Sequence, residues 1–184
     1  MPDHDPSTGA DVLVAFASRH GATRGVAERI AARLRDGGLA VAVSPVEDIQ
    51  ELPPGRAVVL GSPVYDQRWP PEFDAFLERH LECLAGRRVW LFSVGTFGDG
   101  RRVIGPLMRR EPRNIAEVRE ALQPHDYRVF AGVILRHQWP LPSRMLFHAF
   151  GGRLGDNRDW PAVDAWSESI AEALARRPEP AEAR

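Results

Sequence analysis

The chain has little of what disulfide scaffolds, membrane spans and nucleic-acid-binding proteins require. Its 184 residues include one cysteine, Cys83, which excludes a disulfide within the chain and favours a reducing, cytoplasmic location. No apolar run approaches the roughly 20 residues of a membrane-spanning helix, so we expect at most peripheral membrane contact. The formal net charge of −1 gives no long-range attraction to nucleic acid, and we expect none as a partner. The composition is that of an ordinary soluble globular protein.

Motifs typical of metalloproteins, hydrolases and kinases are missing as well. His125, His137 and His148 are far apart, and no Cys/His pair has the spacing of metal ligands, so we expect no metal site. No serine lies in a nucleophile elbow, and no glycine-rich loop carries the lysine of a P-loop. The sequence therefore predicts no catalytic residue. Cys83 is expected to be buried filler in a helix, beside Leu84.

Apolar runs typical of strands alternate with segments of helical periodicity. Because a run such as Ala57–Leu60 is apolar without alternation, we expect strands that are buried on both faces, as in a parallel sheet. This pattern predicts an α/β doubly wound fold, in one domain over residues 10–176 with flexible tails at 1–9 and 177–184. The expected strands lie near Asp11–Ala17, Leu39–Ser44, Arg56–Gly61, Arg87–Ser93 and Arg128–Leu135, and the expected helices near Ala22–Asp36, Pro71–Leu81, Ile115–Leu122 and Ala162–Ala175.

The loop between the first strand and the first helix is the most informative segment. A helix N-terminus directs unpaired N–H groups and a positive dipole end at one point, which is a site for phosphate. Ser18, His20 and Thr23 add side-chain donors, and Gly21 lets the backbone approach a ligand closely. Alternatives stay open, since Ser18 can be a simple helix cap and Arg19 an exposed charge. The predicted phosphate loop is Ser18, Arg19, His20, Gly21, Ala22 and Thr23.

Two further loops follow predicted strands, where a doubly wound sheet binds its ligand. Both carry aromatic residues, either to stack on a flat ring or to pack in the core. Phosphate donors on one loop and aromatics on two others suit flavin mononucleotide (FMN), which has a phosphate tail and a flat ring. The predicted ring contacts are Ser62, Pro63, Val64, Tyr65 and Trp69 in the first of these loops, and Gly95, Thr96, Phe97, Gly98 and Asp99 in the second.

These three loops resemble those of the flavodoxin superfamily. Ser18–Thr23 is similar to the family's phosphate loop, and Gly61–Trp69 and Gly95–Asp99 lie where its two ring-binding loops belong. The second ring loop keeps the Gly-x-x-Gly-Asp pattern of flavodoxins. The resemblance implies a three-layer sandwich with five parallel strands in the order 2-1-3-4-5. It also implies an FMN-dependent oxidoreductase that works with a small-molecule or protein redox partner.

The second half of the chain resembles a narrower branch, the menaquinone-dependent protoporphyrinogen oxidases. The resemblance rests on Tyr127–Ile134, Trp139–Leu154 and Asp159-Trp160, and the basic segment Arg101–Asn114 lies near an insertion of that branch. It implies oxidation of a porphyrinogen with a quinone as acceptor. An electron-transfer flavodoxin, or a binding module that no longer holds flavin, are the alternatives. The apolar stretch Trp139–Phe150 could touch membrane or quinone, cover the flavin or pack on its own sheet.

Two departures from electron-carrier flavodoxins favour an enzyme. The segment Tyr65–Arg68 contains no glycine, whereas carriers commonly place one there for a peptide flip that accompanies one-electron chemistry. Carrier flavodoxins are also strongly acidic, whereas this chain has a net charge of −1. We therefore expect two-electron chemistry.

Overall fold

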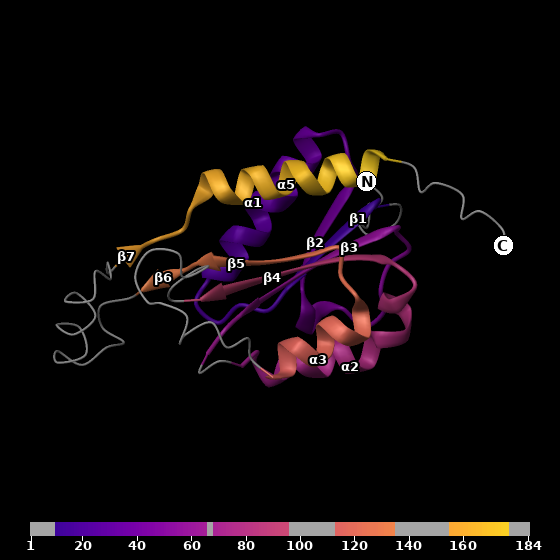
Figure 1. Ribbon diagram of the computed structural model, residues 1–184, viewed down its shortest axis with the longest axis horizontal. Coiled ribbons are helices and arrows are strands. Elements are labelled where there is room, and N and C mark those ends of the chain that lie inside the picture. The colour runs from indigo at the N-terminus through magenta and orange to yellow at the C-terminus, as the bar shows by residue number, and fades with distance from the viewer. Residues whose placement is uncertain (1–9, 66–67, 96–112, 135–154, 177–184) are drawn as a thin grey trace, which may run out of the picture.

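The computed structural model describes residues 10–65, 68–95, 113–134 and 155–176. These residues form a sheet of five parallel strands in the order β2-β1-β3-β4-β5. Helices lie on both sides of the sheet (Figure 1). The expected fold class and strand order are therefore confirmed. The strands are β1 (Val12–Phe16), β2 (Val41–Pro45), β3 (Ala57–Pro63), β4 (Arg88–Gly95) and β5 (Asp126–Ala131).

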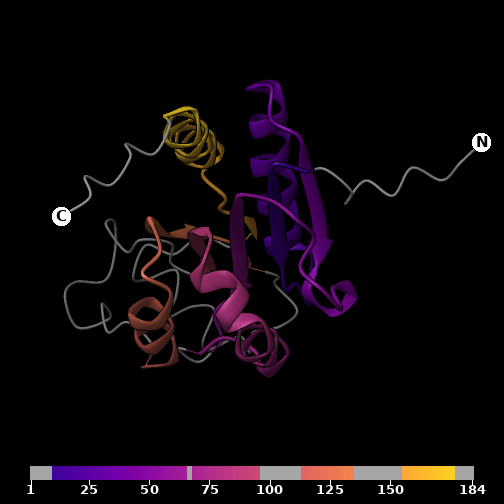
Figure 2. The same cartoon turned by 90° about the vertical axis from the view of Figure 1, so that its right-hand side faces the viewer.

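Two pairs of helices cover the sheet. The helices α1 (Ala22–Asp36) and α5 (Trp160–Ala175) lie on one face, and α2 (Pro71–Ala85) and α3 (Arg113–Leu122) on the other (Figure 1, Figure 2). A 3-10 turn, η1 (Val46–Asp48), follows β2. Beyond the carboxyl end of β5, β6 (Val133–Ile134) and β7 (Gly155–Asp156) form a short antiparallel pair. The sequence predicted α1 from end to end, whereas α2 extends four residues beyond the prediction.

Burial on both faces explains why the strands lack polar alternation. In β1, Val12 and Val14 pack in the cluster under α1 and α5, while Leu13 and Ala15 belong to the cluster under α2 and α3. All four side chains are at most 4% exposed. Because successive residues of a strand point to opposite faces, a two-sided core requires apolar residues at every position.

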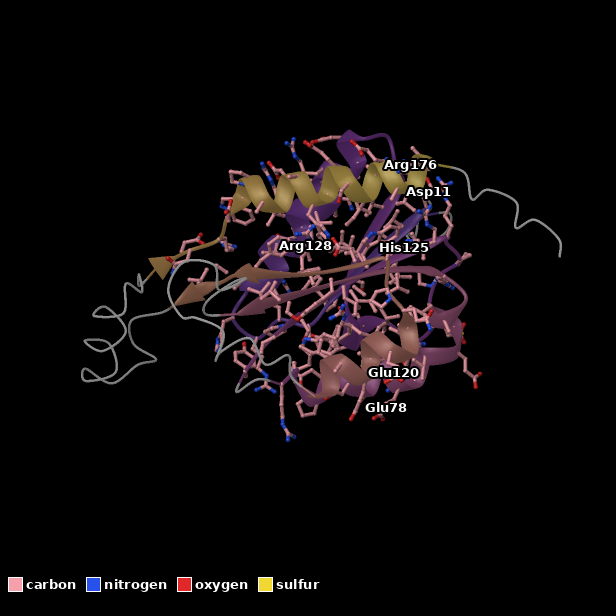
Figure 3. All side chains as sticks on the ribbon, in the orientation of Figure 1. Asp11, Glu78, Glu120, His125, Arg128 and Arg176 are labelled. Carbon is pink, nitrogen blue, oxygen red and sulfur yellow. The ribbon has the colours of Figure 1, made fainter. Side chains whose placement is uncertain are left out.

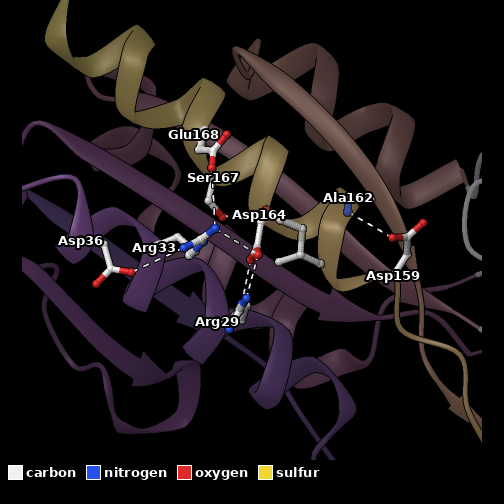
Figure 4. A network of polar contacts seen from close by, with 9 residues as sticks. Arg29, Arg33, Asp36, Asp159, Ala162, Asp164, Ser167 and Glu168 are labelled. Carbon is white, nitrogen blue, oxygen red and sulfur yellow. Dashed lines mark hydrogen bonds and ion pairs between the residues drawn. The ribbon is translucent and has the colours of Figure 1, made fainter.

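Ion pairs join α1 and α5 above the sheet. Arg29 donates two hydrogen bonds of 2.7 Å to the carboxylate of Asp164, and Arg33 lies 3.2 Å from the same carboxylate (Figure 4). These hydrogen bonds hold the pKa of Asp164 below its usual value. The N-terminus of α5 is capped by Asp159, whose Oδ1 accepts the N–H of Ala162 at 3.1 Å. The crossing of these two helices is thus fixed by polar as well as apolar contacts.

The expectation that Cys83 is buried is wrong, because its side chain is exposed. The buried stripe of α2 has helical spacing and passes on the other side of the helix; it comprises Phe73, Phe76, Leu77, His80 and Leu84. The outer surfaces of α2 and α3 are charged, with Glu78 and Glu120 pointing away from the sheet (Figure 3). None of the described helices is long and apolar enough to cross a membrane.

Strand ends differ from the predictions near the carboxyl edge. β3 continues to Pro63 and β4 to Gly95, so that residues predicted for loops begin inside the sheet. The predicted strand Arg128–Leu135 is interrupted at Gly132, whose N–H donates to the carbonyl of Gly95 at 2.8 Å. A glycine also decides the packing of β3. A methyl group on Gly61 would overlap the ring of Phe92, which lies across this strand.

Candidate functional site

The first and second predicted loops leave the sheet side by side. β1 and β3 are neighbours, with Phe16 opposite Gly61, and the N–H of Ala17 donates to the carbonyl of Gly61 at 2.9 Å. The chain crosses from β1 to β2 on one side and returns to β3 on the other, so the strand order reverses here. In doubly wound sheets, ligands bind at the carboxyl edge at such a switch point.

The loop of residues 18–23 presents backbone amides at the N-terminus of α1, as the predicted phosphate site requires. Gly21 begins the helix in the left-handed region, with φ of 80°, which disfavours any residue with a side chain. The first helical hydrogen bond runs from the N–H of Gly25 to the carbonyl of Gly21. The N–H groups of Ala22 and Thr23 therefore have no acceptor within the described helix α1. The first turn of α1, which the structure describes in full, carries no acidic side chain. This helix end fits a phosphate group.

Ser18 holds the loop in shape. Its Oγ accepts the N–H of Gly21 at 3.2 Å and that of Arg24 at 3.3 Å. Gly21 is the N-cap residue of α1 and Ser18 lies three residues before it, so Ser18 is not a simple N-cap, although its Oγ accepts an N–H of the first turn. The hydroxyl hydrogen of Ser18 can donate to an anion. Thr23 is buried, at only 1% exposed. The phosphate contacts of both residues stay predictions.

Tyr65 lies beside the phosphate loop and pairs with Arg68 through the backbone. The N–H of Tyr65 donates to the carbonyl of Arg68 at 3.0 Å, and the N–H of Arg68 returns the bond at 2.8 Å. Tyr65 is 38% exposed, and the rings of His20 and Tyr65 are nearly perpendicular, with centroids 6.4 Å apart. Partial burial raises the pKa of Tyr65, which keeps the phenol neutral near pH 7. The structure thus joins the two loops that the sequence predicted for phosphate and ring.

Arg19 reaches the same ring from the phosphate loop. Its guanidinium lies 5.7 Å from the ring centroid of Tyr65 and donates to both carboxylate oxygens of Glu72, at 3.1 and 3.3 Å. These hydrogen bonds lower the pKa of Glu72 and raise that of Arg19, so the pair is ionised. The sequence does not predict that Glu72, in the first turn of α2, belongs to the site. Nothing in the local pattern connects it to a residue 53 positions away.

Trp69 lies in the hydrophobic core and not at the predicted ring site. The side chain is 3% exposed, its Nε1 donates to Ser93 Oγ at 2.9 Å, and its ring packs edge-on against Phe73. Tyr127 donates its hydroxyl hydrogen to the same serine at 3.0 Å. Trp69 therefore offers little surface to a ligand, and Tyr65 is the aromatic of this loop that can stack. The sequence does not point to Ser93, whose buried hydroxyl accepts the hydrogen bond from Trp69 and so anchors this loop.

The remaining predicted contacts lie at strand ends or outside the described residues. Ser62 and Pro63 are buried in β3, Val64 is half-buried, and Gly95 ends β4. Thr96, Phe97, Gly98 and Asp99 lie outside the described residues, as do Trp139–Phe150 and most of the basic segment from Arg101, so their roles stay predictions. Within the described part of the chain, no group of three or more His, Cys, Asp or Glu side chains could hold a metal ion.

Comparison with known sequences identifies similar proteins. The sequence model of a family described as "Flavodoxin domain" matches residues 13–151. A bifunctional cytochrome P450/NADPH–P450 reductase 2 from Bacillus subtilis (strain 168) is 32% identical over 117 residues, which are 63% of this chain. The chain spans only 11% of the length of that relative. Homologues with this domain bind FMN, in agreement with the cofactor expected from the loops.

Solved structures share the fold over most of the chain. A flavodoxin from the domain Archaea has a TM-score of 0.60 at 16% identity, covering 90% of this chain and 99% of its own. Flavodoxin 2 from Bacillus cereus has a TM-score of 0.56 at 20% identity, with coverage of 90% and 98%. Rubredoxin oxygen:oxidoreductase from Desulfovibrio gigas has a TM-score of 0.60 at 14% identity, with coverage of 89% and 36%. At these identities the likeness concerns the fold alone.

Proposed function

The chain belongs to the flavodoxin domain family, and on that premise we propose that it is an FMN-dependent oxidoreductase that transfers electrons between a donor and an acceptor. The observation that supports this most is the contact between the loop of residues 18–23 and Tyr65. A helix end suited to phosphate and an exposed aromatic ring lie together at the β1–β3 switch point. A molecule with a phosphate tail and a flat ring can engage both.

The phosphate would be held by the amides of Ala22 and Thr23, the hydroxyl of Ser18 and the dipole of α1. Oriented amides at a helix end can hold a dianion without a dedicated cation. Arg24, which is exposed next to the loop, adds a positive charge on the same side. The left-handed Gly21 is required because it turns the chain into the helix at this point.

The isoalloxazine ring would lie against Tyr65. Bound FMN supplies the exchange of electrons, and the protein sets where the ring lies and how easily it is reduced. The neutral phenol of Tyr65 offers an aromatic face without a charge. No side chain among the described residues is proposed to move a proton, so the chain's part is binding and orientation.

The finer proposal is oxidation of a porphyrinogen with a quinone as the acceptor. It is supported by the likeness of Tyr127–Ile134 and Asp159-Trp160 to the menaquinone-dependent protoporphyrinogen oxidases and by the missing glycine in Tyr65–Arg68. We place the protein in the cytoplasm on the basis of its single cysteine. The second candidate, an electron carrier with a protein partner, is favoured by the fold shared with flavodoxins over nearly their full length.

Flavin binding is tested with purified protein titrated with FMN and with riboflavin. We expect the fluorescence of FMN to be quenched when the protein binds it. The affinity for FMN should be well above that for riboflavin, because riboflavin lacks the phosphate. Equal affinities would contradict the phosphate assignment. If the protein binds neither flavin, the alternative is favoured that it is a binding module that no longer holds flavin.

The FMN-loaded protein then separates the two redox candidates. Under anaerobic conditions it is mixed with a porphyrinogen, with and without a water-soluble menaquinone analogue, and formation of the conjugated porphyrin is followed by absorbance. Turnover that requires both FMN and the quinone supports the oxidase. Absence of porphyrin, together with fast reduction or oxidation by a redox protein, supports the carrier. A sample loaded with riboflavin and one without flavin serve as controls.

A further inference from the structure

We propose that Arg19 is a positioning residue that holds Tyr65 in place through Glu72, rather than a counter-ion of the phosphate; this rests on the proposed function. Arg19, Glu72 and Tyr65 are together called the clasp. They come from three segments, namely the phosphate loop, the first turn of α2 and the segment after β3. The clasp therefore connects the phosphate loop and the segment after β3 to the helix α2.

The first argument is the geometry of the guanidinium. Its Nε and Nη2 donate to the two carboxylate oxygens of Glu72 at 3.1 and 3.3 Å, which is the fork-to-fork arrangement that fixes the plane of an arginine. That plane is held 5.7 Å from the centroid of the Tyr65 ring, within the range of a cation–π contact. Glu72 thus takes two N–H groups of the guanidinium, whose Cζ lies over the ring of Tyr65.

The second argument is the balance of charge. Arg19 and Glu72 are both ionised, so that as a pair they contribute no net charge to the phosphate site. Arg24, on the first turn of α1, lies with its guanidinium 5.8 Å from the ring of Phe16 and remains next to the helix end. The chain therefore carries one arginine in the loop and one in the first turn of α1, with different tasks, and Arg24 is the matched control for Arg19.

The third argument is the neighbourhood of Tyr65. Tyr65 is 38% exposed, and two backbone hydrogen bonds fix residues 65 and 68 to each other. The contacts that meet this ring from the phosphate loop are Arg19 over it and the edge of His20. Without the clasp, the side chain would sample other rotamers, and a flat ligand would lose part of its platform.

The two roles predict opposite patterns in flavin affinity. A positioning role predicts that Arg19→Gln and Glu72→Gln each weaken FMN and riboflavin alike, by about threefold, a value typical of an exposed ion pair. It also predicts that the double variant is no weaker than the worse single variant, since both remove the same contact. Arg19→Lys keeps the charge but loses the planar fork and should behave like Arg19→Gln. The control Arg24→Gln should weaken FMN and leave riboflavin unchanged.

A counter-ion role would overturn the proposal and has a distinct signature. In that case Arg19→Gln weakens FMN but not riboflavin, Arg19→Lys is nearly neutral, and Glu72→Gln tightens FMN because it releases the arginine. No effect of any clasp variant on either flavin would also overturn it. If the unmodified protein binds neither flavin, the proposed function fails, and the clasp is then judged without ligand.

The ligand-free readout uses the phenol of Tyr65. The chain has two tyrosines, so Tyr127→Phe leaves Tyr65 as the only one to titrate by ultraviolet absorbance. The charge of Arg19 lowers the pKa of Tyr65 and that of Glu72 raises it. Arg19→Gln should therefore raise this pKa, Glu72→Gln should lower it, and Arg24→Gln should leave it unchanged. A Tyr65 pKa that does not respond to Arg19 or Glu72 would show that the clasp does not form.

Discussion

The substitution Ser18→Asp separates the cap of the phosphate loop from the phosphate site. The Oγ of Ser18 accepts the N–H groups of Gly21 and Arg24, and an aspartate carboxylate is an equally good acceptor at a helix start. The variant should therefore fold at least as well as the parent. It places a negative charge, however, beside the amides that would hold the phosphate of FMN.

The cost to FMN follows from Coulomb's law. A phosphate monoester carries a charge of about −2 near pH 7. A carboxylate about 6 Å from it adds about 1.4 kcal/mol of repulsion in bulk water and about 5.5 kcal/mol at an effective dielectric constant of about 20. The loop is half-exposed, since Ser18 is neither buried nor fully exposed, so a value near 3 kcal/mol is expected. This corresponds to a loss of affinity on the order of 100-fold.

Titration of both flavins at low and high salt checks this value. FMN should bind on the order of 100-fold more weakly, riboflavin should change by less than about threefold, and added salt should recover part of the loss. Ser169→Asp, on the exposed side of α5, introduces the same charge away from the site and serves as the control. Equal weakening of FMN and riboflavin, or unchanged FMN affinity in a folded variant, would refute the phosphate assignment.

Three further predictions concern the stability of the fold. Burial lowers the pKa of His80 below its usual value, so the unfolded chain takes up the proton first and the free energy of unfolding falls as the pH drops below about 6.5. Because Nε2 has no partner among the described residues, His80→Leu should flatten this pH dependence and raise the free energy of unfolding by about 1 kcal/mol at pH 7. Urea titrations measure both effects, and an unchanged slope would contradict the prediction. Gly61→Ala should cost about 1–3 kcal/mol in thermal denaturation because its methyl group overlaps the Phe92 ring, and Phe92→Leu should recover part of the loss; a neutral effect would refute the close approach. Asp164→Asn should cost about 1 kcal/mol, less at high salt, and a salt-independent loss would exclude the ion pairs with α1 as its cause.

Local signals explain how much of the fold could be predicted. The helix α1 has Gly21 before it, Val26, Ile30 and Leu34 at helical spacing, and Gly37 after it, so every cue agrees on its limits. The sequence predicts ends for β3 and β4 that are two residues too early, because glycine and proline residues there are typical of turns. In the sheet, Gly61 and Pro63 stay paired with β4, since neighbouring strands decide where a ladder ends.

Tyr65 and Trp69 show where local reasoning stops. Both are aromatic residues of one loop, yet the structure leaves one half-exposed and buries the other. Trp69 lies one helical turn before Phe73, at the start of the buried stripe of α2, and that spacing is the signal by which its burial could have been found. Its partner Ser93 is distant in the sequence, and no local pattern connects the two.

The two halves of the site differ in the same way. The phosphate half is built from consecutive residues, 18 to 24, whose shape depends on Gly21 and on the hydroxyl of Ser18. The ring half depends on contacts between distant segments, including the pair Arg19–Glu72. A change in α2 can therefore disturb the platform for the ring while the phosphate loop keeps its form, because the loop closes on itself. This asymmetry is the reason that riboflavin and FMN together report on each half: riboflavin reports on the ring half, and the ratio of the two affinities reports on the loop.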